Sequence, residues 1–250
     1  RQRQMCIRDS MYTLCGKDRI HPSTDGHLVM AYLFLKAQGL AGKPVADIRI
    51  DGAGKKVTRS DNCRVSDLSV SSDNLTFTYE AKSLPYPIDT SYYDNEKHTQ
   101  ADALSVIPFM DEMNYEGLSV SGLSDGYYGL TIGGEFIGRF TARELERGIN
   151  MALLQNTPQY KQAMKIRQMN EERWLKERKM REFYWVEYNL MRKTGMLWAC
   201  NEAAVDTLRK YRPHDIFLQW NGDLWLQYMH KGIREDCVNE QQDLVNQIYE

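Results

Sequence analysis

Asp18 and His21 are the side chains whose types and spacing most clearly suit acid–base chemistry. A serine hydrolase needs an imidazole that takes the hydroxyl proton and a carboxylate that orients this imidazole and stabilises its cation. On one tight turn, the carboxylate of Asp18 can reach Nδ1 of His21 and leave Nε2 facing a nucleophile. Pro22 restricts His21 to an extended backbone. Residues 16–22 therefore predict the acid–base half of a catalytic triad.

A helix that would position this turn follows directly. Capping residues occupy 23–25, an almost unbroken apolar run fills 28–37, and Gly39 offers a C-cap. A helix that is apolar on nearly all faces is usually buried between other elements. No burial partners are evident downstream, so we expect them in sequence that precedes this chain.

The stretch 18–40 resembles the last conserved block of the SGNH hydrolases, the GDSL-like lipase and acylhydrolase family. In that family the Asp and His of this block complete a triad whose Ser lies in a Gly-Asp-Ser block near the N-terminus. A Gly and an Asn from two intermediate blocks help to stabilise the oxyanion. The resemblance implies these triad roles for Asp18 and His21, with the other three blocks upstream. The segments 118–141 and 148–150 are similar to the C-terminal extension of some bacterial members.

The same resemblance implies a parent protein that cleaves carboxylic esters, of small molecules or of acetylated carbohydrates. It implies no metal and no organic cofactor, and it implies export from the cell. Without the serine and the oxyanion donors, we expect this chain alone to have little esterase activity.

Residues 1–10 are interpreted as a translated sequencing adapter. They can be back-translated as CGG CAG CGT CAG ATG TGT ATA AGA GAC AG followed by C or T, which matches a sequencing-library transposon adapter in register. The alternative is a natural basic arm. We therefore expect a gene truncated at its 5′ end, in which Met11 need not be a true start.

The predicted fold class is α+β. Residues 11–42 would be the C-terminal remnant of an α/β, flavodoxin-like hydrolase domain. Residues 43–140 would form a β-sandwich-like accessory region, because short alternating runs separated by Gly and Asp turns are typical of antiparallel strands. Within it, 85–114 is interpreted as a long polar loop or an irregular insertion. Residues 141–250 would be mostly helical.

Capping signals place the helices of this last region. Thr141 and Glu144 match a capping box before a helix at 143–154. Thr157-Pro158 starts a helix that runs to about residue 192. The last two helices are predicted at 201–211 and 238–249.

Three other patterns have a chemical and a structural interpretation. His27 could be a metal ligand or a second base, but no ligand of suitable spacing accompanies it, so we take it as structural. The basic excess of 158–193 could bind a partner, but pairs such as Glu172–Lys176 and Glu177–Arg181 favour a solvated helix. The aromatic side chains of 217–228 could stack on sugars, although core packing is the commoner role.

Ser124 lies in a Gly-x-Ser-x-Gly pattern, residues 122–126, that resembles a nucleophile elbow. An elbow requires a strand, a sharp turn at Ser and then a helix. Here the following residues 127–132 alternate like a returning strand, with Asp125-Gly126 as a hairpin turn. We interpret Ser124 as a turn residue.

Composition is ordinary for a globular protein, with 42% hydrophobic and 26% charged residues. The net charge of −2 gives no reason to expect nucleic acid as a partner. No apolar run is long enough to span a bilayer. The scattered cysteines support neither a disulfide framework nor a zinc site.

A second hypothesis remains, a non-enzymatic carbohydrate- or partner-binding module in which Asp18 and His21 are incidental. A Gly-Asp-Ser block upstream would distinguish the two.

Overall fold

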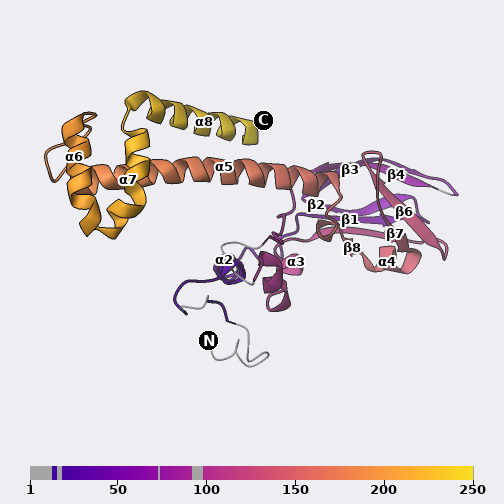
Figure 1. Cartoon of the computed structure of the whole chain (residues 1–250). Helices are drawn as coiled ribbons and strands as arrows, with labels where there is room; N and C mark the ends of the chain where they lie inside the picture. The colour runs from indigo at the N-terminus through magenta and orange to yellow at the C-terminus, as the bar shows by residue number, and fades with distance from the viewer. Residues whose placement is uncertain (1–12, 16–18, 73, 92–97, 250) are drawn as a thin grey trace. The chain divides into compact units, whose positions relative to one another are not determined.

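The structure is a computed structural model that describes residues 13–15, 19–72, 74–91 and 98–249. Residues 1–10 and Asp18 lie outside this part. The chain divides into two compact units, Arg1–Met164 and Lys165–Glu250. Small sheets fill much of the first unit and helices the second, which confirms the predicted α+β class (Figure 1). The predicted boundaries near residues 43 and 141 stay predictions.

The first unit contains three short sheets and several helices. Its helices are α2 (Thr24–Ala37), η1 (Gln100–Ser105), α3 (Phe109–Glu112), α4 (Ala142–Arg147) and η2 (Met151–Leu153). Its strands are β1 (Ala46–Asp51), β2 (Lys56–Asp61), β3 (Cys63–Val70), β4 (Leu75–Ala81), β5 (Glu116–Ser121), β6 (Tyr127–Ile132), β7 (Glu135–Thr141) and β8 (Ile149–Asn150).

The central sheet has the strand order β2-β1-β5-β8, and it is not purely antiparallel as predicted. β1 runs parallel to β5, with Ile48 opposite Leu118. These two strands are buried along most of their length, which is typical of parallel pairing in the middle of a sheet. The hairpins β3–β4 and β6–β7 are antiparallel as expected. Apolar side chains from both hairpins pack with those of β1 and β5 in one core.

Two local predictions in this unit are wrong. Asp125-Gly126 does not turn β5 back onto β6, because β5 pairs with β1 and β8 while β6 pairs with β7. The β6–β7 turn contains Gly133 and Gly134, which both have positive φ. The helix predicted at 143–154 ends at Arg147, because Gly148 adopts φ 93° and ends it. The capping box of Thr141 and Glu144 is present as predicted.

The second unit is a helical bundle. Its elements are the greater part of α5 (Pro158–Val186), a π-helical turn η3 (Glu187–Met191), α6 (Glu202–Tyr211), η4 (Arg212–His214), α7 (Ile216–Tyr228) and α8 (Lys231–Tyr249). α5 begins at Pro158 as predicted, and Asn201 caps α6 through the Ala204 amide, at 3.0 Å. The core is built around Phe183, Leu208 and Trp225.

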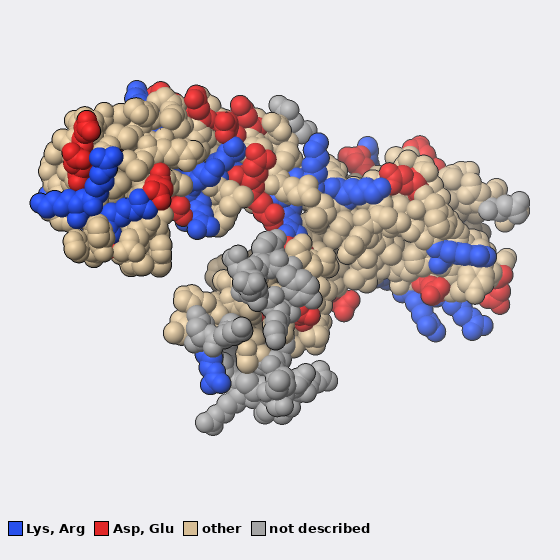
Figure 2. Space-filling view, viewed as in Figure 1, with Lys and Arg blue, Asp and Glu red and all other residues tan. Residues whose placement is uncertain are grey.

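The basic excess along α5 is interleaved with carboxylates. Both predicted pairs are present, Glu172–Lys176 at 3.8 Å and Glu177–Arg181 at 3.7 Å. Blue and red side chains alternate on the face of the helices that Figure 2 displays, and no patch of one sign forms there. The predicted ion pairing along α5 is confirmed, and the interpretation of its basic excess as a solvated face without a partner stays a prediction. None of the described helices has the length and apolarity needed to cross a membrane.

Candidate functional site

His21 lies in an exposed turn whose backbone is held against the start of α2. Directly after it, Pro22 forms an isolated antiparallel bridge with Cys15. The amide of Ser23 donates to the carbonyl oxygen of Leu14, at 3.1 Å. The segment before the turn is therefore fixed to the segment after it, and these contacts hold the backbone on both sides of His21.

Gly26 permits the close approach between the first turn of α2 and the backbone of Leu14. A Cβ atom added to Gly26 would lie 2.0 Å from the carbonyl oxygen of Leu14. Any larger residue would therefore push the Leu14 backbone away from α2. The sequence signal was visible as a glycine in the first turn of a helix, but its partner could not be inferred.

A buried carboxylate, Asp25, organises the first turn of α2. Its side chain is fully buried. Oδ1 accepts hydrogen bonds from the hydroxyl of Ser23 and from the amide of Gly26, the latter at 2.9 Å. Oδ2 lies 3.7 Å from Nδ1 of His98. A buried carboxylate requires hydrogen bonds or an opposite charge. The N-terminal end of the helix dipole also favours a negative charge here.

The Asp25–His98 contact brings a second imidazole close to the His21 turn. Sequence reasoning missed this pair, since Asp25 was considered only as a capping residue and His98 stood in a long polar segment without a motif. The charge of the pair depends on whether His98 is protonated. An acid beside a histidine, next to the predicted catalytic turn, is a suitable arrangement for positioning that turn.

Only one member of the predicted triad pair, His21, lies within the described residues. Asp18 lies outside the described residues, so its geometry relative to His21 stays a prediction. His27 is exposed on α2. Within the described ranges, no three His, Cys, Asp or Glu side chains gather in a way that could hold a metal ion.

The two faces of α2 differ, which corrects the expectation of a helix without downstream burial partners. Leu28, Val29 and Tyr32 pack in a core with apolar side chains of η1 and α3. Tyr32 donates to Glu112 at 2.6 Å, and burial with this hydrogen bond raises the pKa of the phenol. The other face carries three apolar side chains that are each at least half exposed: Met30, Leu33 and Phe34.

Ser124 does not stand in a nucleophile elbow. The strand β6 follows it rather than a helix. The serine lines a cleft of about 710 Å³ whose described lining contains no histidine and no carboxylate. Lys55 is the one basic side chain of that lining, and no hydrogen bond between it and Ser124 is present, so Ser124 does not have the histidine and carboxylate of a Ser-His-Asp triad within this lining.

Comparisons with known proteins agree with this architecture. Residues 164–250 match the family model of the diltiazem deacetylase C-terminal helical domain. The match begins one residue before the second compact unit. A solved structure of a gut microbial diltiazem-metabolizing enzyme is 39% identical, with a TM-score of 0.91 over 99% of this chain. The two share one fold over that length. This chain spans 56% of the length of that solved structure. A search of curated proteins found no match to this chain.

Proposed function

We propose that the protein of which this chain is part is a serine ester hydrolase of the SGNH type that removes acyl groups, acetyl first among them. The observation that carries the proposal is the 39% identity, across 99% of this chain, to a diltiazem-metabolizing enzyme. The deacetylase name of the matching helical domain supports the acetyl group as the one removed. The substrate class is an ester of a small molecule or of an acetylated carbohydrate.

In the proposed mechanism, His21 is the general base and Asp18 orients it. A serine hydroxyl oxygen attacks the ester carbonyl while Nε2 of His21 takes the hydroxyl proton. The tetrahedral intermediate expels the alcohol, which receives that proton from His21. A water molecule then attacks the acyl-enzyme, with His21 again taking and returning a proton. Asp18 accepts a hydrogen bond from Nδ1 and stabilises the imidazolium.

The nucleophile is proposed to come from the part of the parent protein that lies outside these 250 residues. Ser124 is not a suitable substitute, since the described lining of its cleft contains no histidine and no carboxylate. The chain spans 56% of the related structure, which leaves room for a serine block in such a parent. The exposed apolar face of α2 is a suitable surface for that part to cover.

The upstream reading frame in the source DNA tests this proposal. We expect it to encode a Gly-Asp-Ser block after a short strand, then blocks with a Gly and an Asn. A frame that starts near Met11, with no such block, would overturn the assignment and favour a binding module. The chain by itself should leave an activated acetyl ester intact. Hydrolysis by the chain that is abolished by Ser124→Ala would contradict the proposed origin of the nucleophile.

A further inference from the structure

Trp198 adopts a strained backbone in a loop of the helical unit. Its φ is 64°, in the left-handed region that a bulky side chain rarely occupies. Its side chain is nevertheless 45% exposed, so burial of the indole does not account for the strain. Residues held in such conformations are concentrated at functional sites, where the surrounding structure enforces them.

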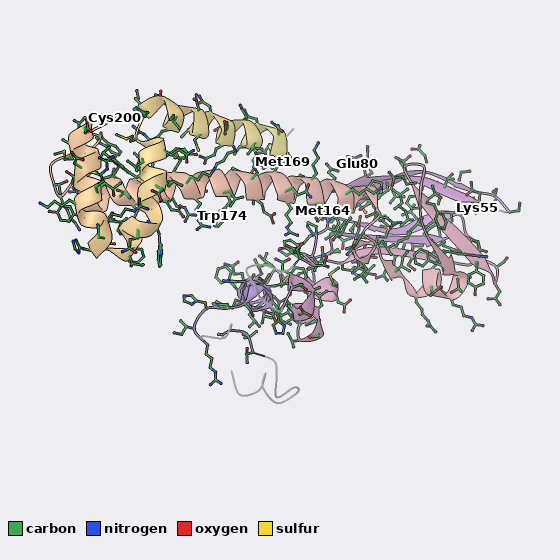
Figure 3. The ribbon with its side chains drawn as sticks, in the orientation of Figure 1. Lys55, Glu80, Met164, Met169, Trp174 and Cys200 are labelled. Carbon is green, nitrogen blue, oxygen red and sulfur yellow. The ribbon has the colours of Figure 1, made fainter. Side chains whose placement is uncertain are left out.

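Buried groups enforce the conformation of Trp198. Glu187, which is 1% exposed, accepts a hydrogen bond from the Trp198 amide at 2.9 Å and another from Nε1 of Trp225 at 2.8 Å. Glu187 lies in the π-helical turn η3, and such turns often occur at functional sites. The loop has a second attachment, because Sγ of Cys200 lies 2.9 Å from Nδ1 of His230. Figure 3 labels Cys200 at this loop.

Two tyrosines fix the orientation of the exposed indole. The rings of Tyr184 and Tyr188 each lie 5.9 Å from that of Trp198, with interplanar angles of 85° and 86°. Both tyrosines are themselves 39% or more exposed. The three rings form an aromatic platform that is held in place before any ligand arrives, so little conformational entropy is lost on binding.

A groove of about 460 Å³ lies beside this platform. It is lined by Tyr184, Trp198, Lys231, Arg234, Glu235, Val238 and Asn239. Val238 is the one aliphatic member of this lining. The groove therefore combines aromatic rings with amide, carboxylate and cationic groups that can donate and accept hydrogen bonds.

One of the two cations in the groove lining is paired with its carboxylate, and the other is held by neutral carbonyl groups. Lys231 lies 3.2 Å from Glu235. One nitrogen of Arg234 donates to the carbonyl oxygens of Tyr228 and Met229, at 2.8 and 2.6 Å. A polyanion such as a nucleic acid would need several uncompensated cations, whereas this lining has one, Arg234, and a lipid would need an aliphatic lining.

We propose that this groove binds a saccharide, with the aromatic platform as its stacking surface. A pyranose presents a C–H face that packs on an aromatic ring, and its equatorial hydroxyls form hydrogen bonds with planar polar side chains at the edge. The groove offers both kinds of contact within the helical unit. The inference rests on this geometry and does not depend on the proposed esterase activity.

Affinity electrophoresis of the full 250-residue chain tests the proposal. Native gels containing soluble xylan, mixed-linkage β-glucan or galactomannan, which are uncharged or nearly so, serve as probes. The unmodified chain should be retarded by at least one of them. Trp198→Ala should lose that retardation, with at least a tenfold increase in the apparent Kd. Trp220→Ala is the matched control, because this indole is 65% exposed in the same unit but does not line the groove.

A second variant keeps the test independent of folding. Asn239 is exposed on α8, so Asn239→Ala leaves the core intact and should weaken retardation several-fold. Far-UV circular dichroism checks that each variant is folded. No retardation of the unmodified chain by any of the three polysaccharides would overturn the proposal. Equal losses for Trp198→Ala and Trp220→Ala would also overturn it, since they would indicate non-specific adsorption to exposed aromatics.

Discussion

Replacing Glu187 with alanine should strongly destabilise the helical unit. The carboxylate is 1% exposed and accepts two hydrogen bonds, from the amide of Trp198 and from the indole nitrogen of Trp225. Trp225 is fully buried, so its nitrogen cannot exchange this partner for water. Leaving a buried donor without an acceptor costs about 1–3 kcal/mol. With two donors affected, the free energy of unfolding should fall by about 2–5 kcal/mol.

Urea denaturation followed by tryptophan fluorescence measures this loss selectively. All 5 tryptophans of the chain fall within residues 165–250, so the signal reports on the helical unit. With an m-value of about 1–2 kcal/mol/M, the urea midpoint should fall by about 1 M or more. Glu187→Gln should lose less, because its amide oxygen keeps one acceptor.

Glu182→Ala provides the matched control for Glu187→Ala. Glu182 pairs with Arg178 at 2.7 Å on the solvated side of α5, and such pairs contribute about 0–1 kcal/mol. A Glu187→Ala chain as stable as Glu182→Ala would refute the conclusion that the buried carboxylate holds the two tryptophan donors.

Two further predictions concern the first unit. Burial raises the pKa of Glu116 above its ordinary 4.5, so the folded state binds this proton more tightly than the unfolded state. The stabilising contribution is therefore complete below 4.5 and is lost as pH rises above it. Glu116→Gln should flatten that decline in a series of melting curves recorded by circular dichroism, and an unchanged slope would contradict the assignment. Gly26→Ala should lower stability by about 1–3 kcal/mol, because the new methyl group would collide with the Leu14 carbonyl. Gly232→Ala, which adds a methyl group in open space within α8, should instead raise stability by about 0.5–1 kcal/mol, and equal effects of the two substitutions would argue against the collision.

Local sequence signals predicted local structure well. Thr157-Pro158 and Asn201 marked the starts of α5 and α6, because a cap acts through atoms within one turn. The β3–β4 hairpin is likewise made from neighbouring runs. The parallel pairing of β1 with β5 was missed, since it joins segments far apart in the chain and leaves no periodic signal.

The catalytic roles of Asp18 and His21 stay predictions, and the structure bears only on the surroundings of His21. The Asp-x-x-His-Pro spacing identified the His21 turn, which the backbone holds against α2. The contact between Asp25 and His98 depends on how a distant segment folds back, so no local motif predicts it. The role of Glu187 was hidden for the same reason. A glutamate in a charged helix looks solvated until its two tryptophan partners are known.

Hydrolysis of an activated acetyl ester by the proposed parent protein tests the central claim most directly. Removal of the triad base should reduce kcat by about 10⁴-fold or more in His21→Ala. His27→Ala, which alters another exposed histidine a short way along α2, should retain the activity of the unmodified protein. A His21→Ala protein that hydrolyses the ester as fast as the His27→Ala protein would contradict the assignment of His21 as the catalytic base.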